Sequence, residues 1–204
     1  MLRRPHGPAD VTEGASIDVG PHPHIGLQTV TWLLDGQVLH RDSLGSEQVV
    51  RPGQLNLMTS GDGVTHSEEA TGHYRGRLEG IRLWVALPER TRRGGAAFEH
   101  LTELPRLDLR ADGRQTGEAT VLVVLGGEVR IETIEPARLV LIGGTPMPEP
   151  ISMWWNFVAR NRQEIDEAYR AWRDREREGR FGQVDSPLPT IEAPAPPWWR
   201  AGEA

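Results

Sequence analysis

The chain of 204 residues is 37% hydrophobic and 25% charged, a composition typical of a globular protein with one large domain or two small ones. It contains no cysteine, which excludes disulfides, thiolate zinc sites and a cysteine nucleophile, and no lysine, which excludes Schiff-base chemistry and a P-loop. The net charge of −6 argues against nucleic acid as the main ligand, because general phosphate binding needs a basic surface.

The N-terminal residues and the hydropathy of the chain give no sign of a membrane partner. The start "MLRRPHGPAD" has no apolar core of the kind found in signal peptides, and no apolar run approaches the ~20 residues that cross a bilayer. We therefore expect a cytoplasmic protein that does not bind membranes.

Short β-rich segments follow an irregular lead-in over residues 1–20. They are apolar or β-branched and are separated by turns of Gly, Pro and Asp, of which Asp35-Gly36 is a hairpin signal. The expected strands lie within residues 27–34, 37–42, 47–59, 64–69 and 78–88. Many short strands at this spacing predict a β-barrel or a sandwich.

The second half of the chain contains a weak internal repeat. Residues 89–119 are polar with little periodicity and form the candidate linker. After it, "VLVVLGGEV" at 121–129 matches the pattern of "VTWLLDGQV" at 30–38. The second copy has no neighbouring histidine, so metal chemistry is expected in the first copy alone.

One helix is predicted near the C-terminus. Asn161 can cap it, with Glu164 three residues on completing a capping box, and Gly179 is expected to end it. The Pro- and Ala-rich end over 181–204 is expected to be extended, with its two adjacent tryptophans packing back onto the body or onto another subunit.

Two histidine-bearing segments carry the strongest chemical signal. His22 and His24, and likewise His66 and Glu68, are two residues apart, so each pair points to one side of a strand. Adjacent strands of a barrel would bring three imidazoles and a carboxylate to one point, a set that suits a divalent Fe, Mn, Co, Ni or Zn ion. The spacing alone leaves solvent-facing histidines equally favoured, and the alternative for Glu68 is a surface acid beside Glu69.

The remaining histidines show weaker patterns. His40, on a returning strand, is expected at the surface or behind the ligands rather than on the metal. His6, His73 and His100 lie in irregular or polar segments without a partner at strand spacing, and are not candidate ligands.

Four segments together resemble the pirin family of cupins. They are "DVGPHPHIGLQTVTWLLDGQVLHRDSLGS", "RPGQLNLMTSGDGVTHSEE", "LEGIRLWVALP" and "LIGGTPMPEPISMWWNFVARNRQEI", and they cover most of residues 18–180. The resemblance implies two cupin β-barrels, with one divalent transition metal per chain, most often Fe²⁺, in the N-terminal barrel alone. It places the family's histidine ligands on His22, His24 and His66 and its carboxylate ligand on Glu68.

The resemblance also implies the domain organisation. The chain is expected to be mainly β, a bicupin with a truncated second barrel and one C-terminal helix. The expected divisions are an N-terminal metal-binding cupin, incomplete at its start, over 1–95, a shortened C-terminal cupin over 96–160, the helix over 161–180 and the tail over 181–204. Exposed strand edges in such a shortened frame favour a homodimer or a swapped arrangement, or else marginal stability.

Two functions follow from the resemblance, so whether the chain is an enzyme is left open. Some bacterial pirins resemble quercetin (flavonol) 2,4-dioxygenases: the flavonol 3-hydroxyl loses a proton, with Glu68 as ligand and candidate acceptor, and dioxygen cleaves the heterocycle with release of carbon monoxide. Other pirins are non-enzymatic regulators that bind a protein partner in a metal-dependent way.

Trp32, Leu57 and Met58 are candidates for the cavity lining, although barrel core is the simpler assignment for each.

Overall fold

The computed structural model describes residues 9–12, 17–72, 74–104, 106–111, 114–120, 140, 146–174 and 179–199. These residues form many strands and one helix, which confirms the predicted mainly β fold. They fall into two compact units, of which the first comprises residues 1–103 with 149–204 and the second residues 104–148.

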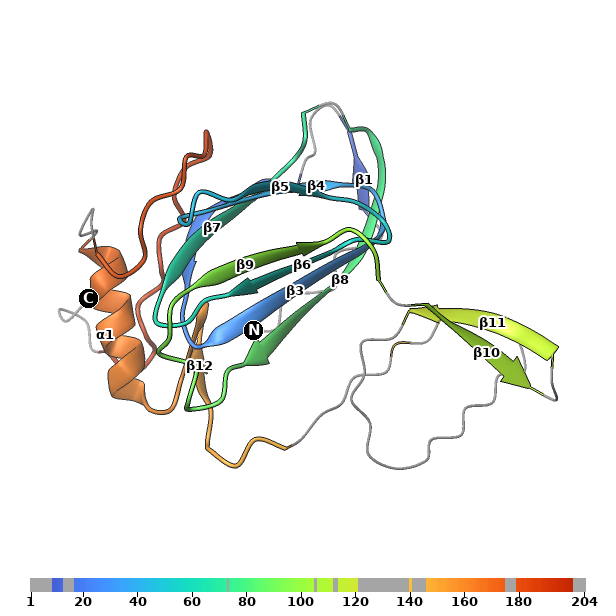
Figure 1. The fold of residues 1–204 in the computed structure, drawn as a ribbon. Coiled ribbons are helices and arrows are strands. Elements are labelled where there is room, and N and C mark those ends of the chain that lie inside the picture. Colours follow the sequence, from blue (N-terminus) through green and yellow to red (C-terminus); the bar gives the residue numbers. More distant parts are fainter. Residues whose placement is uncertain are drawn as a thin grey trace. The chain divides into compact units, whose positions relative to one another are not determined.

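Two antiparallel sheets of the first unit face each other (Figure 1). The four-stranded sheet has the order β2 (Val19–His24), β7 (Val64–Glu69), β4 (Val38–Asp42) and β5 (Glu47–Val50). The five-stranded sheet has the order β1 (Ala9–Val11), β8 (Gly76–Ala86), β3 (Leu27–Asp35), β6 (Leu55–Thr59) and β9 (Ala97–Leu101). The predicted strand segments are therefore strands. The lead-in is not irregular throughout, because β1 pairs with β8 and gains its backbone hydrogen bonds there.

The space between the sheets has an apolar floor at one end. Side chains from five strands pack there: Val11, Leu33, Val38, Val50 and Leu78. Gly80, opposite Leu33, leaves room for this packing, since a Cβ at Gly80 would lie 2.7 Å from Leu33 Cδ2. Two residues further along the same faces, the inward positions become polar, with Thr31 on β3 and His40 on β4.

The C-terminal part of the first unit packs on the sheets through a second apolar cluster. It consists of the hairpin of β12 (Ser152–Trp154) and β13 (Phe157–Ala159), followed by helix α1 (Arg162–Arg173). Phe157 is fully buried in this cluster beside Ile25, which follows β2. The Val158 N–H donates to the Ile25 carbonyl at 3.1 Å, so the hairpin is hydrogen-bonded to the segment between β2 and β3.

Helix α1 begins where the sequence predicts but ends earlier. Asn161 Oδ1 accepts the backbone N–H of Glu164 at 3.0 Å, which confirms the predicted N-cap. The helix ends at Arg173 instead of continuing to Gly179, because no apolar residue follows Trp172 in this stretch to be buried against the sheets. Within the described residues, no helix is long and apolar enough to span a membrane.

The extended tail packs back on helix α1, as predicted. The indole N–H groups of Trp198 and Trp199 both donate to Asp166 Oδ1, at 2.8 and 2.6 Å. Trp172 on the helix in turn donates its indole N–H to the Ile191 carbonyl at 3.1 Å. Trp154 of β12 donates its indole N–H to the Pro194 carbonyl at 3.2 Å, so four indole donors tie the tail to the body.

The described residues of the second unit form an antiparallel hairpin, of β10 (Arg106–Ala111) and β11 (Arg114–Thr120). Residues 121–129, the predicted second copy of the repeat, lie outside the described residues, as do His6 and His73. The shortened second cupin over 96–160 and the homodimer therefore stay predictions.

Gly26 lies where the C-terminal hairpin approaches the sheets most closely. Its φ is +66°, and a Cβ here would lie 2.0 Å from the Val158 carbonyl oxygen. We therefore expect Gly26→Ala to lower the free energy of unfolding by about 3 kcal/mol or more, since left-handed strain adds to displacement of the hairpin.

Gly45→Ala is the matched control, to be measured beside it by urea denaturation. Gly45 has a φ of +86°, yet nothing lies within 4 Å of a Cβ built on it. Gly45→Ala should lower the free energy of unfolding by only about 1 kcal/mol, the strain of a left-handed backbone at a residue with a Cβ. Equal losses at the two positions would contradict the close approach of the hairpin.

Candidate metal centre

Strands β2 and β7 bring three histidines together at the polar end of the interior. His22 lies directly opposite His66 in the β2–β7 register, and His24 is two residues along on the same face. The ring centroids are 4.4 Å apart for His22 and His66, and 4.9 Å apart for His24 and His66. One ring nitrogen from each histidine lies within 4.8 Å of the other two, and all three residues are buried. The structure thus groups the three histidines that the sequence singles out.

Two of these histidines are oriented by backbone carbonyls. His22 Nδ1 lies 2.8 Å from the Gly20 carbonyl oxygen, and His24 Nδ1 lies 3.1 Å from the Asn156 carbonyl oxygen in the β12–β13 turn. Since a carbonyl can only accept, each Nδ1 carries the proton of its ring. Nε2 of each neutral ring is left with a lone pair, the form that binds a metal ion.

The third histidine meets the second through Nε2. His24 Nε2 and His66 Nε2 face each other at 3.1 Å, and both residues are almost completely buried. The lone pair of His24 at this contact needs either a proton from His66 or a cation beside it. A divalent transition ion bound about 2 Å from imidazole nitrogens would satisfy it and its neighbours at once. The donor set therefore fits a metal of this kind.

Burial keeps the three imidazoles neutral. It lowers the pKa of His22 to about 4 and holds the pKa values of His24 and His66 well below the ordinary value. Repulsion from neighbouring cationic groups, Arg82 among them, adds to the effect. At neutral pH, protons therefore compete little with a metal ion for these nitrogens.

Glu68 faces the same interior but has a different partner. It is 3% exposed, and its carboxylate forms an ion pair with the guanidinium of Arg82 from β8. Arg82 Nη2 also donates to Thr31 Oγ1 at 3.0 Å, and burial lowers the pKa of Arg82 to about 9. Among the described residues, the side chains close enough together to hold a metal ion are the three histidines, and Glu68 is not one of them. Sequence reasoning missed Arg82, because its strand "LEGIRLWVALP" does not show which face carries the arginine.

The candidate lining residues divide between the two faces of the five-stranded sheet. Met58 is 1% exposed and faces the interior, where its β9 neighbour Phe98 stacks on a buried histidine. Trp32 and Leu57 each lie next to an inward-facing residue, Thr31 on β3 and Met58 on β6. Side chains alternate along a strand, so both point to the opposite face of the sheet. They therefore do not line the interior, where the inward positions of these strands carry Thr31, Asn56 and Met58.

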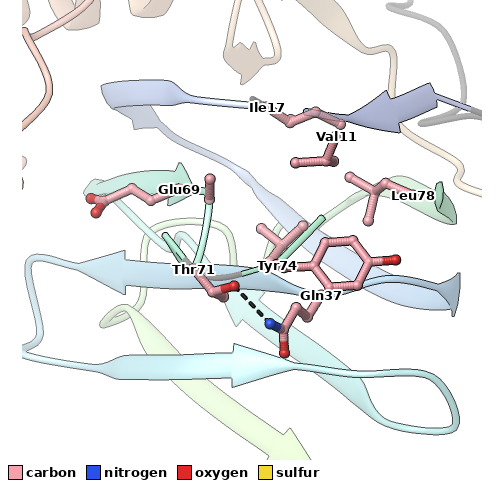
Figure 2. Close-up of a pocket in the computed structure, with 9 residues that line it drawn as sticks. Val11, Ile17, Gln37, Glu69, Thr71, Tyr74 and Leu78 are labelled. Carbon is pink, nitrogen blue, oxygen red and sulfur yellow. Dashed lines mark hydrogen bonds between the residues drawn. The ribbon is translucent and has the colours of Figure 1, made fainter. Parts of the chain in front are cut away.

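A small cavity lies beside the apolar floor, away from the histidines (Figure 2). Val11, Leu78 and Tyr74 are among its lining residues, and Gln37 Nε2 donates to Thr71 Oγ1 at 2.7 Å. With about 10 Å³ it has room for roughly one water molecule. It is too small to bind a substrate.

Among the other histidines, His40 is closest to the group. It is 5% exposed and its ring centroid lies 5.3 Å from that of His66, so it lies behind the candidate ligands and not at the surface. The spacing of His40 and Asp42 matches that of the two predicted pairs, a signal that the sequence reasoning did not use. His100 lies on β9, where its Nδ1 is 2.6 Å from Asn56 Oδ1.

The chain is similar to known proteins over most of its length. A family model described as Pirin matches residues 2–85, and one described as Pirin C-terminal cupin domain matches residues 108–182. A Pseudomonas aeruginosa protein named "Putative quercetin 2,3-dioxygenase" is 35% identical, across 94% of this chain and 79% of its own length. A "Pirin-like protein" of Caulobacter vibrioides is 31% identical, across 82% of this chain and 80% of its own. The crystal structure of a quercetin 2,3-dioxygenase from Acinetobacter baumannii has a TM-score of 0.77 and 29% identity, covering 96% of this chain and 84% of that one.

The convergence of the three imidazoles predicts that metal binding depends on His66. Elemental analysis after reconstitution with ferrous iron should find about one ion per wild-type chain and little in His66→Ala, since two monodentate histidines remain. His100→Ala is the control, because His100 bonds Asn56 outside the group. Equal metal contents in the wild type and His66→Ala would contradict the site.

Proposed function

Because the chain belongs to the pirin family, we propose that it is a metal-dependent flavonol dioxygenase whose site lies in its N-terminal cupin. In this proposal His22, His24 and His66 hold one divalent transition metal, Fe²⁺ first, with Mn, Co, Ni or Zn as alternatives, and Glu68 is the fourth ligand. The proposal is supported above all by the three buried ring nitrogens that converge on one point.

Each residue of the proposed site has its own role in the reaction. A bound divalent metal supplies Lewis acidity that polarises the flavonol 3-hydroxyl and orients it for reaction with dioxygen. With three neutral histidines and one carboxylate as ligands, a divalent ion would keep a net positive charge, which would favour the deprotonated flavonol. Glu68, two residues from His66, accepts the hydroxyl proton at a carboxylate oxygen. Before a metal binds, Arg82 stabilises the ionised carboxylate.

Access to the site supports an aromatic substrate. The three histidines are at most 6% exposed, so water is largely excluded from them. Trp84 on β8 is 36% exposed and its ring lies edge-on to that of His24 at 5.1 Å. An aromatic molecule that approaches His24 from this side meets the indole first, and such ring contacts stabilise by about 0.5–1.5 kcal/mol. The names of the similar proteins point to quercetin as the substrate to test first.

Oxygen consumption with quercetin tests the proposal directly. The Fe²⁺-loaded wild type should consume dioxygen and release carbon monoxide in equal amounts, and His66→Ala should do neither above the uncatalysed rate. His100→Ala should behave as wild type, since its side chain does not touch the histidine group. A metal-loaded wild type that consumes no dioxygen with quercetin would reject this substrate while leaving the metal site intact.

Competition between the metal and Arg82 for Glu68 gives a second test. As a ligand, the carboxylate must leave the guanidinium, so Arg82→Gln is expected to raise Ni²⁺ affinity about tenfold. Glu68→Gln removes the ligand and should lower that affinity about 10- to 100-fold.

The double variant separates ligation from simple charge repulsion. With Glu68 already replaced, the gain from Arg82→Gln should shrink, because no carboxylate is left to be released. Calorimetric titration of the wild type, both single variants and the double variant gives the coupling. An Arg82→Gln effect of the same size with and without Glu68 would show that Arg82 does not compete with the metal for Glu68. An unchanged affinity in Glu68→Gln would remove Glu68 from the ligand set.

A further inference from the structure

His40 and Asp42 on β4 take no part in the proposed ligand set, yet both are buried beside it. His40 is 5% exposed and Asp42 is 3% exposed. In the β4–β7 register Asp42 lies opposite His66 and His40 lies opposite Glu68, so both side chains point into the interior. The His40 ring stacks on Phe98 with a centroid distance of 4.4 Å and an interplanar angle of 13°, which fixes the plane of the imidazole.

Asp42 is held in place as an acceptor. Its Oδ1 accepts the backbone N–H groups of Leu44 at 2.9 Å and Ser46 at 3.0 Å, and its Oδ2 lies 2.9 Å from His40 Nε2. A carboxylate has no proton to donate, so the proton at this contact belongs to His40 Nε2. In a neutral His40 ring, Nδ1 is then the acceptor.

His66 continues this chain of hydrogen bonds toward the proposed metal. Its Nδ1 lies 3.5 Å from His40 Nδ1. Because His40 Nδ1 accepts, the proton at this contact belongs to His66 Nδ1, and His66 Nε2 carries a lone pair. That Nε2 faces His24 Nε2 at 3.1 Å, so of the two partners that the His24 lone pair could have, a proton from His66 is excluded and a cation remains.

We infer that Asp42 and His40 are positioning residues that set the tautomer and the orientation of His66 for metal binding, an inference that rests on the proposed metal site. His22 and His24 obtain the same orientation from the carbonyls of Gly20 and Asn156. His66 obtains it from two side chains in series. Hydrogen bonds to the far nitrogen of a ligand histidine typically change metal affinity about 10- to 100-fold.

Asp42→Asn tests the inference with almost no change in side-chain volume. The N–H groups of Leu44 and Ser46 hold the amide oxygen at the Oδ1 position, so the amide NH₂ takes the Oδ2 position and donates to His40 Nε2. His40 must then carry its proton on Nδ1 and donate to His66 Nδ1. The proton of His66 moves to Nε2, the atom that would bind the metal, and Ni²⁺ affinity in calorimetry should fall about 10- to 100-fold.

Three further variants separate this role from simple packing. His40→Phe keeps the stacking on Phe98 but offers no acceptor, and should show the same loss of Ni²⁺ affinity. His40→Asn places an amide oxygen near the Nδ1 position and should recover most of the affinity. Asp62→Asn makes the same chemical change in an exposed ion pair with Arg180, and should stay within about twofold of wild type.

Nitrogen-15 NMR of the ring tautomers in the metal-free full chain gives a readout that does not depend on catalysis. The wild type should show His66 protonated on Nδ1, and Asp42→Asn should show it protonated on Nε2. A wild-type His66 protonated on Nε2, or an unchanged Ni²⁺ affinity in folded Asp42→Asn or His40→Phe, would overturn the inference. If the variants do not fold, the wild-type tautomer decides. Lack of flavonol turnover would reject the proposed function alone and leave these readouts unaffected.

Discussion

Three buried imidazoles whose Nε2 atoms converge are the constraint on which the rest of the structure depends. Neutral imidazoles in a desolvated interior need a hydrogen-bond partner for each nitrogen, or a cation that takes the lone pairs. The antiparallel pairing of β2 and β7 places His22 opposite His66 and so sets the distance between the rings. A shift of this register by one residue would turn the histidines of one strand to the other face of the sheet and separate the three imidazoles.

The C-terminal segment is part of this site although it is distant in sequence. The β12–β13 turn supplies the Asn156 carbonyl that orients His24, and Phe157 is buried next to Ile25 at the end of β2. Gly26 permits the approach because it has no Cβ to meet the Val158 carbonyl. The body of the first unit therefore includes residues from both ends of the chain, and the surroundings of the three histidines are assembled from both.

The interior separates an apolar floor from a polar end along the same strands. Leu33 and Val38 pack in the floor, and two residues away on each strand Thr31 and His40 face the polar end. The floor supplies the hydrophobic burial that holds the two sheets together, which allows the other end to carry buried charges that contribute little stability by themselves. At that end, Arg82 compensates the charge of Glu68, and the Asp42 carboxylate is held by hydrogen bonds from His40, Leu44 and Ser46.

The sequence by itself determined the strands within residues 27–88, the N-cap at Asn161 and the two histidine pairs, because these depend on local turns and on the two-residue period of a strand. It did not predict β1 in the lead-in, or β9, β10 and β11 in the expected linker over 89–119. Only the tertiary structure decided which face of each strand points inward. Alternation marks two faces without saying which is buried. Here the inner face combines the apolar floor with polar residues near the histidines, so Trp32 and Leu57 lie outside while Arg82 lies inside. Only the tertiary structure likewise decided the partners of Glu68 and His40, because these partners come from strands that meet only when the sheets face each other.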